Sequence, residues 1–281
     1  MIFGKYWKIF MWATIVFLIF SVGILVHNTI TTGSFLKKDI DLSGGKTITI
    51  QVDNVDIQNV KAAFPYANVR LTTGITKNLI IEIPFDRNET EVVDGLHRVV
   101  SFSGQPSIRT VGPALGSIFF QQAQISLVAA FILMAIVVFI IFRSLVPSSI
   151  VVLCAATDII GTMAILSLLD VSLSLPVLAA LLTLIGYSVD TDILLTNEML
   201  KSGRKDYRES VHKALKTGLT MTGTTLVALL AMYFVSGSVV IEQIAFTLLI
   251  GLLIDMPATW ITNAGIMKMW FEKMEKKGVH K

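Results

Sequence analysis

Six long apolar runs dominate the distribution of hydrophobic and polar positions along this chain. They lie at roughly 9–28, 124–142, 149–169, 176–198, 217–235 and 243–265. Each is close to the ~20 residues that an α-helix needs to cross the hydrocarbon core of a bilayer. The pattern predicts a membrane α-helical bundle of six transmembrane helices.

Residues 30–115, between the first and second runs, follow a different pattern. Four stretches alternate or are β-branched, as strands are, and two have the spacing and first-turn polar residues of helices. The strands are KTITIQV, ANVRLTTG, NLIIEIP and PSIRTVGP, and the helices are VDIQNVKAAF and ETEVVDGLHRVVSFSG. We expect Asp53 or Asn54 to cap the first helix and Gly104 to end the second. The order βαββαβ predicts a ferredoxin-like ectodomain.

Composition agrees with a membrane protein and narrows the chemistry. Only 15% of the 281 residues are charged, against about 25% in a soluble domain. The single cysteine, Cys154, rules out an intrachain disulfide. The net charge of +3 gives no reason to expect nucleic acid as a partner. No cofactor or metal motif occurs, and the ectodomain holds no catalytic constellation. Asn88-Glu89-Thr90 is an N-glycosylation sequon, although three-residue matches are common by chance.

The distribution of basic residues predicts the orientation. The first run is longer than the apolar region of a signal peptide, about 7–15 residues, so we expect a retained anchor. Lys and Arg gather at one set of run ends, which the positive-inside rule places in the cytoplasm. These residues are Lys5, Lys8, Arg143, Lys201, Arg204, Lys205, Arg208, Lys213, Lys216, Lys268, Lys273, Lys276, Lys277 and Lys281.

This orientation divides the chain into four parts. Residues 1–29 form a cytoplasmic N-terminus and the first transmembrane helix, and 30–115 form the extracytoplasmic domain. Residues 116–267 hold transmembrane helices 2–6, and 268–281 form a basic cytoplasmic tail. Both termini are therefore expected in the cytoplasm, on a multi-pass protein of the cell membrane.

Four carboxylates inside the apolar runs are the candidate functional residues: Asp158, Asp190, Asp192 and Asp255. An ionised carboxylate in hydrocarbon is costly, so such groups face a bundle interior and mark ion or substrate paths. No Lys or Arg accompanies them at membrane depth. The pattern predicts a proton or ion relay. The alternative is helix packing through small residues and interhelical hydrogen bonds, which explains the nearby Gly and Thr but not the carboxylates.

Helical spacing predicts which way these acids face. Asp190 shares a polar stripe with Thr183, Gly186, Tyr187 and Asn197, which we expect to face the bundle interior beside Asp158. Asp192 points to nearly the opposite side, with Ser188 and Thr196. Two interpretations of it stay open: interfacial water reaches it, or it takes part in the relay.

The fifth and sixth runs also carry polar stripes. Asp255 aligns with Thr247, Gly251, Thr259 and Thr262. Pro257 is expected to weaken the hydrogen-bond ladder of its helix, which a neighbouring polar group can satisfy. The fifth run offers a stripe without charge, formed by Thr217, Thr220, Gly223 and Thr224.

Three short motifs carry a family resemblance. They are Asp41-Leu42-Ser43-Gly44-Gly45, Val111-Gly112-Pro113-Ala114-Leu115-Gly116 and Leu184-Ile185-Gly186-Tyr187-Ser188-Val189-Asp190. In this order, around a ferredoxin-like ectodomain, the chain resembles the SecF members of the SecD/SecF family, within the resistance-nodulation-division superfamily. The resemblance covers nearly the whole chain.

The resemblance implies a non-enzymatic role in protein export. Members pair with SecD and use the proton motive force to pull or hold a translocating polypeptide after it leaves the SecY channel. Bacterial members carry Asp-Thr and then an Asp-Arg pair in the fourth helix. This chain has Asp190-Thr191-Asp192 and then Asn197-Glu198, without arginine. These residues, together with Asp255-Met256-Pro257, resemble the sequences of archaeal members.

Two other classes compete with this interpretation. A small-molecule exporter of the same superfamily would need larger ectodomains and a second six-helix half. An intramembrane aspartyl protease could use acids on separate helices. Its Tyr-Asp and Gly-x-Gly-Asp signatures are absent, because Gly-Tyr-Ser-Val precedes Asp190.

Overall fold

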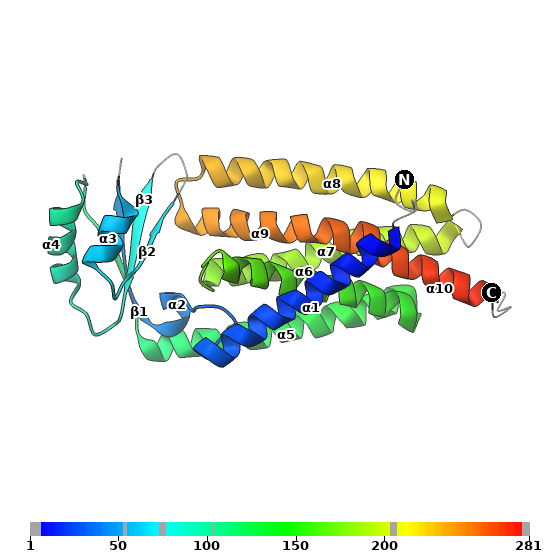
Figure 1. Ribbon diagram of the computed structural model, residues 1–281, viewed down its shortest axis with the longest axis horizontal. Coiled ribbons are helices and arrows are strands. Elements are labelled where there is room, and N and C mark those ends of the chain that lie inside the picture. The colour runs from blue at the N-terminus through cyan, green and yellow to red at the C-terminus, as the bar shows by residue number, and fades with distance from the viewer. Residues whose placement is uncertain (1–6, 53–54, 73–76, 103, 203–206, 277–281) are drawn as a thin grey trace.

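Six long apolar helices and a small sheet domain make up the molecule (Figure 1). The computed structural model describes residues 7–52, 55–72, 77–102, 104–202 and 207–276. The helices of the bundle are α1 (Trp7–Thr32), α5 (Pro113–Phe142), α6 (Leu145–Leu168), α7 (Leu175–Ser202), α8 (Tyr207–Val235) and α9 (Val239–Pro257). A π-helical segment, η1 (Ala258–Asn263), continues α9 into α10 (Ala264–Lys276). The six predicted apolar helices are confirmed.

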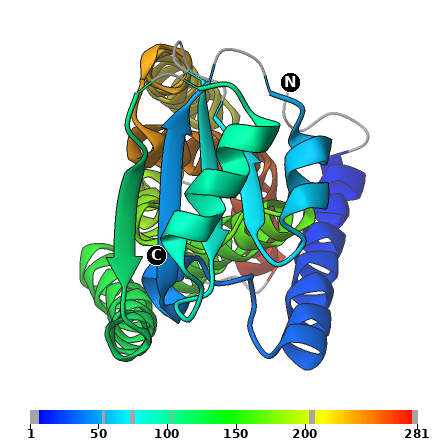
Figure 2. The same ribbon diagram turned by 90° about the vertical axis from the view of Figure 1, so that its left-hand side faces the viewer.

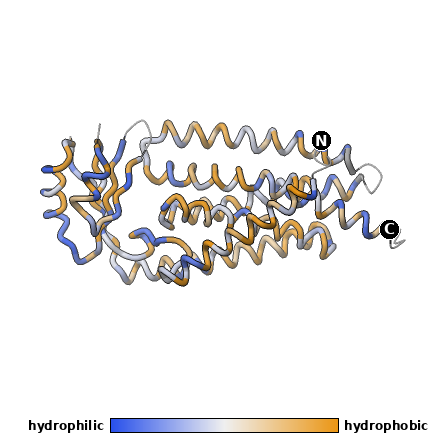
Figure 3. The backbone as a smooth tube through the Cα atoms, in the orientation of Figure 1, coloured by the Kyte–Doolittle hydropathy of each residue, from blue (hydrophilic) through white to orange (hydrophobic). Residues whose placement is uncertain are grey.

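Hydropathy separates the two parts of the molecule. The bundle is largely hydrophobic along its length, whereas polar residues are frequent in the sheet domain at one end (Figure 3). Two helices begin ten or more residues before their apolar runs. The helix α5 begins at Pro113, a residue suited to the first helical position because its missing N–H has no intrahelical partner there. The helix α8 begins at Tyr207 and includes the basic residues before its apolar run.

The sheet domain contains the four predicted strands in antiparallel pairing. They are β1 (Gly45–Gln51), β2 (Asn68–Leu71), β3 (Asn78–Ile83) and β4 (Ser107–Val111), in the spatial order β2-β3-β1-β4. Ile48 of β1 lies opposite Ile81 of β3 and Ile108 of β4. Ile48 and Ile81 are fully buried with Leu96 in a core of their own. This core is separate from that of the bundle.

Two helices cover the face of the sheet that points away from the bundle (Figure 2). They are α3 (Ile57–Ala63) and α4 (Glu89–Val99). Asp56 caps α3, while the predicted caps Asp53 and Asn54 lie outside the described residues. Asn88, the acceptor of the predicted sequon, caps α4. The helix α4 ends before the predicted Gly104, because the backbone turns to an extended conformation at Val100.

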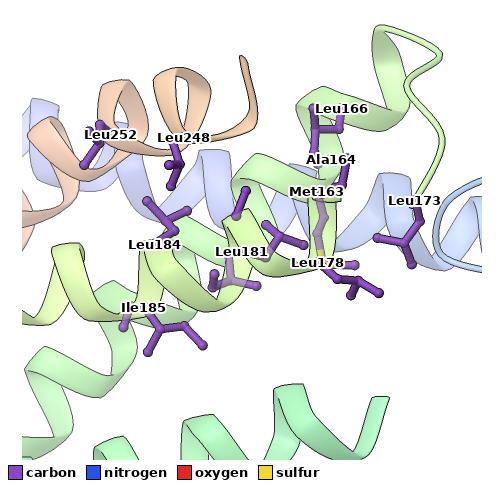
Figure 4. Close-up of a cluster of buried hydrophobic side chains, with 14 of the residues drawn as sticks. Met163, Ala164, Leu166, Leu173, Leu178, Leu181, Leu184, Ile185, Leu248 and Leu252 are labelled. Carbon is purple, nitrogen blue, oxygen red and sulfur yellow. The ribbon is translucent and has the colours of Figure 1, made fainter. Parts of the chain in front are cut away.

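The helix α7 lies at the centre of the bundle and packs against α5, α6, α8 and α9. Its apolar side chains meet those of α9 in the bundle core, where Leu181 and Leu184 lie near Leu248 and Leu252 (Figure 4). Gly251 allows the close approach, because a Cβ atom there would lie 2.3 Å from a methyl carbon of Leu184. The helix α1 packs on α6 and η1 instead.

A short helix that the sequence pattern did not predict, α2 (Ile40–Ser43), joins the two parts. Before it, the chain pairs with the loop between α6 and α7. The N–H of Asp39 donates to the carbonyl of Leu173 (2.9 Å), and the N–H of Leu173 donates to the carbonyl of Lys37 (2.7 Å). These bonds fix the base of the sheet domain to the end of the bundle.

The π-helical segment follows directly after Pro257, where the sequence predicts a weakened ladder. Proline lacks an N–H and its ring crowds the preceding turn, so the wider π turn relieves both effects. The thiol of Cys154 on α6 lies 3.5 Å from the carbonyl oxygen of Ala258, in the distorted turn. A neighbouring polar group therefore does meet the disturbed backbone.

Candidate functional site

Three of the four predicted acids meet inside the bundle. Asp158 comes from α6, Asp192 from α7 and Asp255 from the end of α9, and each is fully buried. We call Asp158, Asp192 and Asp255 the carboxylate cluster. The helices α6, α7 and α9 pack against one another, which brings residues far apart in sequence to one depth of the bundle.

Hydroxyl groups hold two of these carboxylates. Ser188 donates a hydrogen bond to Oδ2 of Asp158 (2.5 Å). Thr191 donates to Oδ2 of Asp255 (3.2 Å), and Thr259 donates to its Oδ1 (3.1 Å). The carboxyl groups of Asp158 and Asp255 are close enough to interact electrostatically. Like charges in such a buried site disfavour each other.

Asp192 has a separate partner, Asn263 at the end of η1. The amide nitrogen of Asn263 lies 2.7 Å from Oδ1 of Asp192 and 3.3 Å from the hydroxyl of Thr196. Sequence reasoning identified Thr196 and Thr259 on the correct helix faces but missed Asn263. The available signal was its position about two turns after Asp255, on the same side of an apolar run.

The charge balance of the carboxylate cluster is unusual for a buried site. No Lys or Arg is among its partners in the ion pairs and hydrogen bonds of the described residues. Oδ1 of Asp158 and Oδ2 of Asp192 are buried without any hydrogen-bond partner. Buried polar atoms are normally paired, and an unpaired charged one is costly. The arrangement can accept protons at these two oxygens. Within the described part of the chain, no three His, Cys, Asp or Glu side chains converge to hold a metal ion.

Asp190 does not belong to this cluster, and its predicted placement is wrong. It is exposed on the outer surface of α7, as are Thr183, Gly186 and Tyr187 of the same stripe. The expected proximity of Asp158 and Asp190 inside the bundle therefore fails. Asp192, expected near water, is fully buried instead. Polarity within an apolar run indicates that a face avoids lipid, but it does not say whether that face meets the same chain or another one.

The polar stripe of α8 also lies on the surface. Thr217, Thr220 and Thr224 are exposed, and each hydroxyl donates to a carbonyl of its own helix. A Cβ atom added at Gly186 of α7 or Gly223 of α8 would meet nothing within 4 Å. The stripe that runs from Thr247 of α9 to Thr262 of η1, by contrast, is buried.

The first two sequence motifs meet in a second site between the sheet domain and the bundle. A Cβ atom on Gly44 would lie 2.5 Å from Cα of Pro113, and one on Gly116 would lie 2.6 Å from the backbone nitrogen of Gly44. One on Gly45 would lie 2.7 Å from the carbonyl of Ile83. We call this backbone contact between residues 41–45 and 112–116 the glycine junction. Among the four glycines of the two motifs, only Gly112 has open space around it.

Asp41 supplies the charge of this region. Arg109 of β4 pairs with it at 2.5 Å. Asp41 also lines a cavity together with Pro176, at the start of α7. Burial raises the pKa of Asp41 above its ordinary value of 3.8, although the Arg109 guanidinium opposes that shift. Asp41 thus joins α2 to the sheet.

A polar cavity of about 210 Å³ separates the sheet from the ends of α7 and α9. Asp39, Asp41, Arg70, Glu82 and Arg109 line it. Arg70 pairs with both Asp39 (3.2 Å) and Glu82. These ion pairs join strands of the sheet to α2 and its cap Asp39, whose backbone is in turn hydrogen-bonded to Leu173 in the loop between α6 and α7.

Comparisons with known proteins agree on one family. The model described as "Protein export membrane protein SecD/SecF, C-terminal" matches residues 94–273. The chain is 36% identical to the protein-export membrane protein SecF of Pyrococcus furiosus, over 96% of this chain and 93% of that one. It is 39% identical to SecF of Methanolacinia petrolearia, over 91% of each.

The fold has a counterpart among solved structures. The crystal structure of SecDF from Thermus thermophilus, a translocon-associated membrane protein, superimposes with a TM-score of 0.76 at 21% identity. The match covers 94% of this chain and 38% of SecDF, so this chain corresponds to well under half of that protein.

Proposed function

Because this chain belongs to the SecD/SecF family of protein-export membrane proteins, we propose that it is the SecF subunit of a Sec translocation machinery. In this role it assists the export of polypeptides across the cell membrane with a SecD partner, energised by the proton motive force. It is a multi-pass membrane protein and not an enzyme. The relatives are export proteins, which argues against both an intramembrane protease and a small-molecule exporter.

The carboxylate cluster carries the proposed mechanism. Oδ1 of Asp158 and Oδ2 of Asp192 accept protons, and the carboxyl group of Asp255 lies near that of Asp158. Two carboxylates so close do not both ionise readily, since like charges disfavour each other in a low-dielectric site. Loading or releasing one proton changes which hydrogen bonds Ser188 and Thr191 can make, and therefore how α6, α7 and α9 pack. Asp190, on the outer face of α7, continues the relay toward the partner.

Movement of the bundle helices is transmitted to the sheet domain through the glycine junction. The helix α5 has 30 residues, or about 45 Å at 1.5 Å per residue. Its first turn is locked to Gly44 by backbone contact. Asp41 of this junction and Pro176 at the start of α7 line the same polar cavity. A change in α7 packing is thus transmitted to the outer domain, which acts on the emerging polypeptide.

The proposed arrangement completes the topology. Both termini lie in the cytoplasm, and residues 30–115 form an outer domain of ferredoxin-like type, supported by its element order and its strand order β2-β3-β1-β4. Residues 1–29 and 116–267 form the membrane part, and 268–281 form the basic tail. The outer domain faces the substrate polypeptide, and the translocon channel SecY lies beside the complex.

An export assay tests this proposal. Membrane vesicles that contain the full chain and its partner should export a preprotein faster with a proton gradient than after an uncoupler collapses it. The replacement of Asp158 by asparagine should remove this increment while the complex still assembles. An unchanged increment in that variant would contradict the relay. Export that never depends on this chain would contradict the assigned function itself.

A further inference from the structure

An apolar groove lies between α1 and α9 on the side of the bundle that carries neither polar stripe. It has a volume of about 520 Å³. Phe10, Ala13 and Phe17 of α1 form one wall, Ile250 and Pro257 of α9 form the other, and Ile165 of α6 lies at its base. From Ile250 to Ile261 the groove runs roughly 16 Å along the helix at 1.5 Å per residue. That length suits an extended hydrocarbon chain rather than a globular ligand.

The position of the groove favours lipid over the partner subunit. The polar stripes of α7 and α8 mark the faces that avoid lipid, and α1 packs against α6 and η1 rather than against α7 or α8. The lipid-facing side of α1 is apolar along its length, with Val16, Ile19 and Phe20 all exposed. The groove therefore opens toward the hydrocarbon core of the bilayer.

Positive charge lies at one end of the groove. Trp7 and Met11 pack against Gly265 and close that end, since a Cβ atom on Gly265 would lie 3.1 Å from the Trp7 ring. The ammonium group of the exposed Lys8 lies 5.8 Å from the centre of the same ring. That of Lys268 lies 4.5 Å from it, but this side chain is nearly buried and pairs with Glu272 at 3.8 Å. Tryptophan and lysine at this level are typical of the membrane interface.

We infer that the groove binds one acyl chain of an anionic phospholipid whose headgroup lies against Lys8. The choice of an anionic headgroup rests on charge complementarity at this end. In the orientation proposed above, the lipid belongs to the cytoplasmic leaflet. The inference does not depend on the export function, because lipid binding is measured without export.

The groove and the carboxylate cluster share the π-helical segment. Pro257 and Ile261 face the groove, whereas Thr259 and Asn263 of the same segment bind Asp255 and Asp192. An acyl chain in the groove fills the space behind this segment. It thereby supports this segment on the side opposite the carboxylate cluster.

Native mass spectrometry tests the site on the full chain co-expressed with its SecD-like partner. The complex is released from nanodiscs of equal parts phosphatidylglycerol and phosphatidylcholine. Ala13→Trp and, independently, Leu253→Trp fill the groove from opposite walls, and each should remove one retained phosphatidylglycerol. Val16→Trp adds the same ring to an exposed position on α1 outside the groove and should keep it. Retention of the partner shows that each variant is folded.

The headgroup preference is tested with charge variants. Lys8→Gln should reduce the preference for phosphatidylglycerol about fivefold, the effect expected for one basic residue near an anionic surface. Lys213→Gln, an exposed lysine of α8 at the same end of the bundle, should leave it unchanged. Equal retention in the groove-filling variants and Val16→Trp would overturn the site. So would a cross-link from a cysteine at position 13 to the partner subunit, which would make the groove a protein interface.

Discussion

Asp192 is a buried carboxylate with only one of its two oxygens hydrogen-bonded. One oxygen receives the Asn263 amide at 2.7 Å, and the other has no hydrogen-bond partner. An ionised group in this setting is costly. Asparagine at this position keeps the contact with the Asn263 amide but cannot bind or release a proton. Asp192→Asn therefore tests the effect of protonation while the packing is retained.

We expect Asp192→Asn to abolish most of the gradient-dependent increment in export while assembly with the partner persists. The measurement is the export rate in vesicles with and without an uncoupler. Asp170→Asn is the matched control, since Asp170 is an exposed acid paired with Lys37 at the outer end of the bundle. A full increment in Asp192→Asn would mean that this acid is structural.

Asp41 predicts a pH dependence outside the membrane. Burial raises the pKa of Asp41 in the folded protein. Its contribution to the free energy of unfolding is therefore present below the ordinary pKa of 3.8 and is lost as the pH rises through the pKa of the folded state. The asparagine of the Asp41→Asn variant does not titrate, so the variant does not lose stability in this way. The melting temperature of the variant minus that of the wild type should therefore increase between about pH 4 and pH 7. A difference that stays flat or decreases with pH would contradict the shift.

At this scale, the sequence predicts which residues matter better than it predicts their partners. A carboxylate in an apolar run is costly wherever it points, so Asp158, Asp192 and Asp255 could be recognised without a structure. The rotation of each helix decides their neighbours. Both faces of α7 carry small polar residues, so the sequence pattern does not show which face is buried. The structure exposes Asp190 and buries Asp192, the reverse of the prediction.

The glycine junction is the element that ties the outer domain to the bundle. The approach of Gly116 to Gly44 leaves no room for a side chain, because a Cβ atom would lie 2.6 Å from a backbone nitrogen. Gly116→Ala should destabilise the protein by about 1–3 kcal/mol, as overpacking does. Thermal unfolding in detergent measures this loss.

Gly112→Ala provides the matched control within the same motif. Its φ of −68° is available to alanine, and a Cβ atom there meets nothing within 4 Å. We expect a change within about 0.5 kcal/mol, as at an ordinary surface position. If the two variants were equally stable, the close approach at residue 116 would not be a structural requirement.

The outer domain has enough core to fold alone. Val60 and Leu96 are fully buried in a cluster that contains only residues 48–100. A fragment of residues 35–110 should therefore give a folded circular dichroism spectrum and a cooperative urea transition, although a domain of this size is marginal. Leu96→Ala should lower its stability by about 2–5 kcal/mol and unfold it. A random-coil spectrum for the unmodified fragment would contradict this expectation.

Elements with local signals were predictable, and elements that depend on tertiary contact were not. The strands and the apolar helices follow from period-2 and spanning-length patterns. The helix α2 has only four residues and exists because Asp39 caps it and the loop at Leu173 holds it. The π-helical segment depends on Pro257 together with contacts from α6 and α7, of which the sequence shows only the proline.

The molecule as a whole leaves two polar helix faces uncovered. Thr183, Gly186, Tyr187 and Asp190 are exposed on α7, and Thr217, Thr220 and Thr224 are exposed on α8. These faces are poorly suited to lipid, and small residues on them allow a second helix to approach closely. The expected partner, a larger six-helix SecD-like protein, would cover both. The chain should therefore copurify with such a protein in mild detergent and be inactive alone in liposomes.

Leucine substitutions on these faces test which surface the partner covers. Gly186→Leu and Gly223→Leu add bulk where a Cβ atom meets nothing in this chain, so neither should unfold it. Each should obstruct a closely packed partner at a cost of about 1–3 kcal/mol, which corresponds to roughly a ten- to hundredfold weaker association. Gly23→Leu is the control, because Gly23 has equally open space but lies on α1, away from both stripes. Partner recovery after detergent dilution measures the association for each variant. If Gly23→Leu weakened it as much as Gly186→Leu, the partner would contact α1 as well, and the polar stripes would not define the interface.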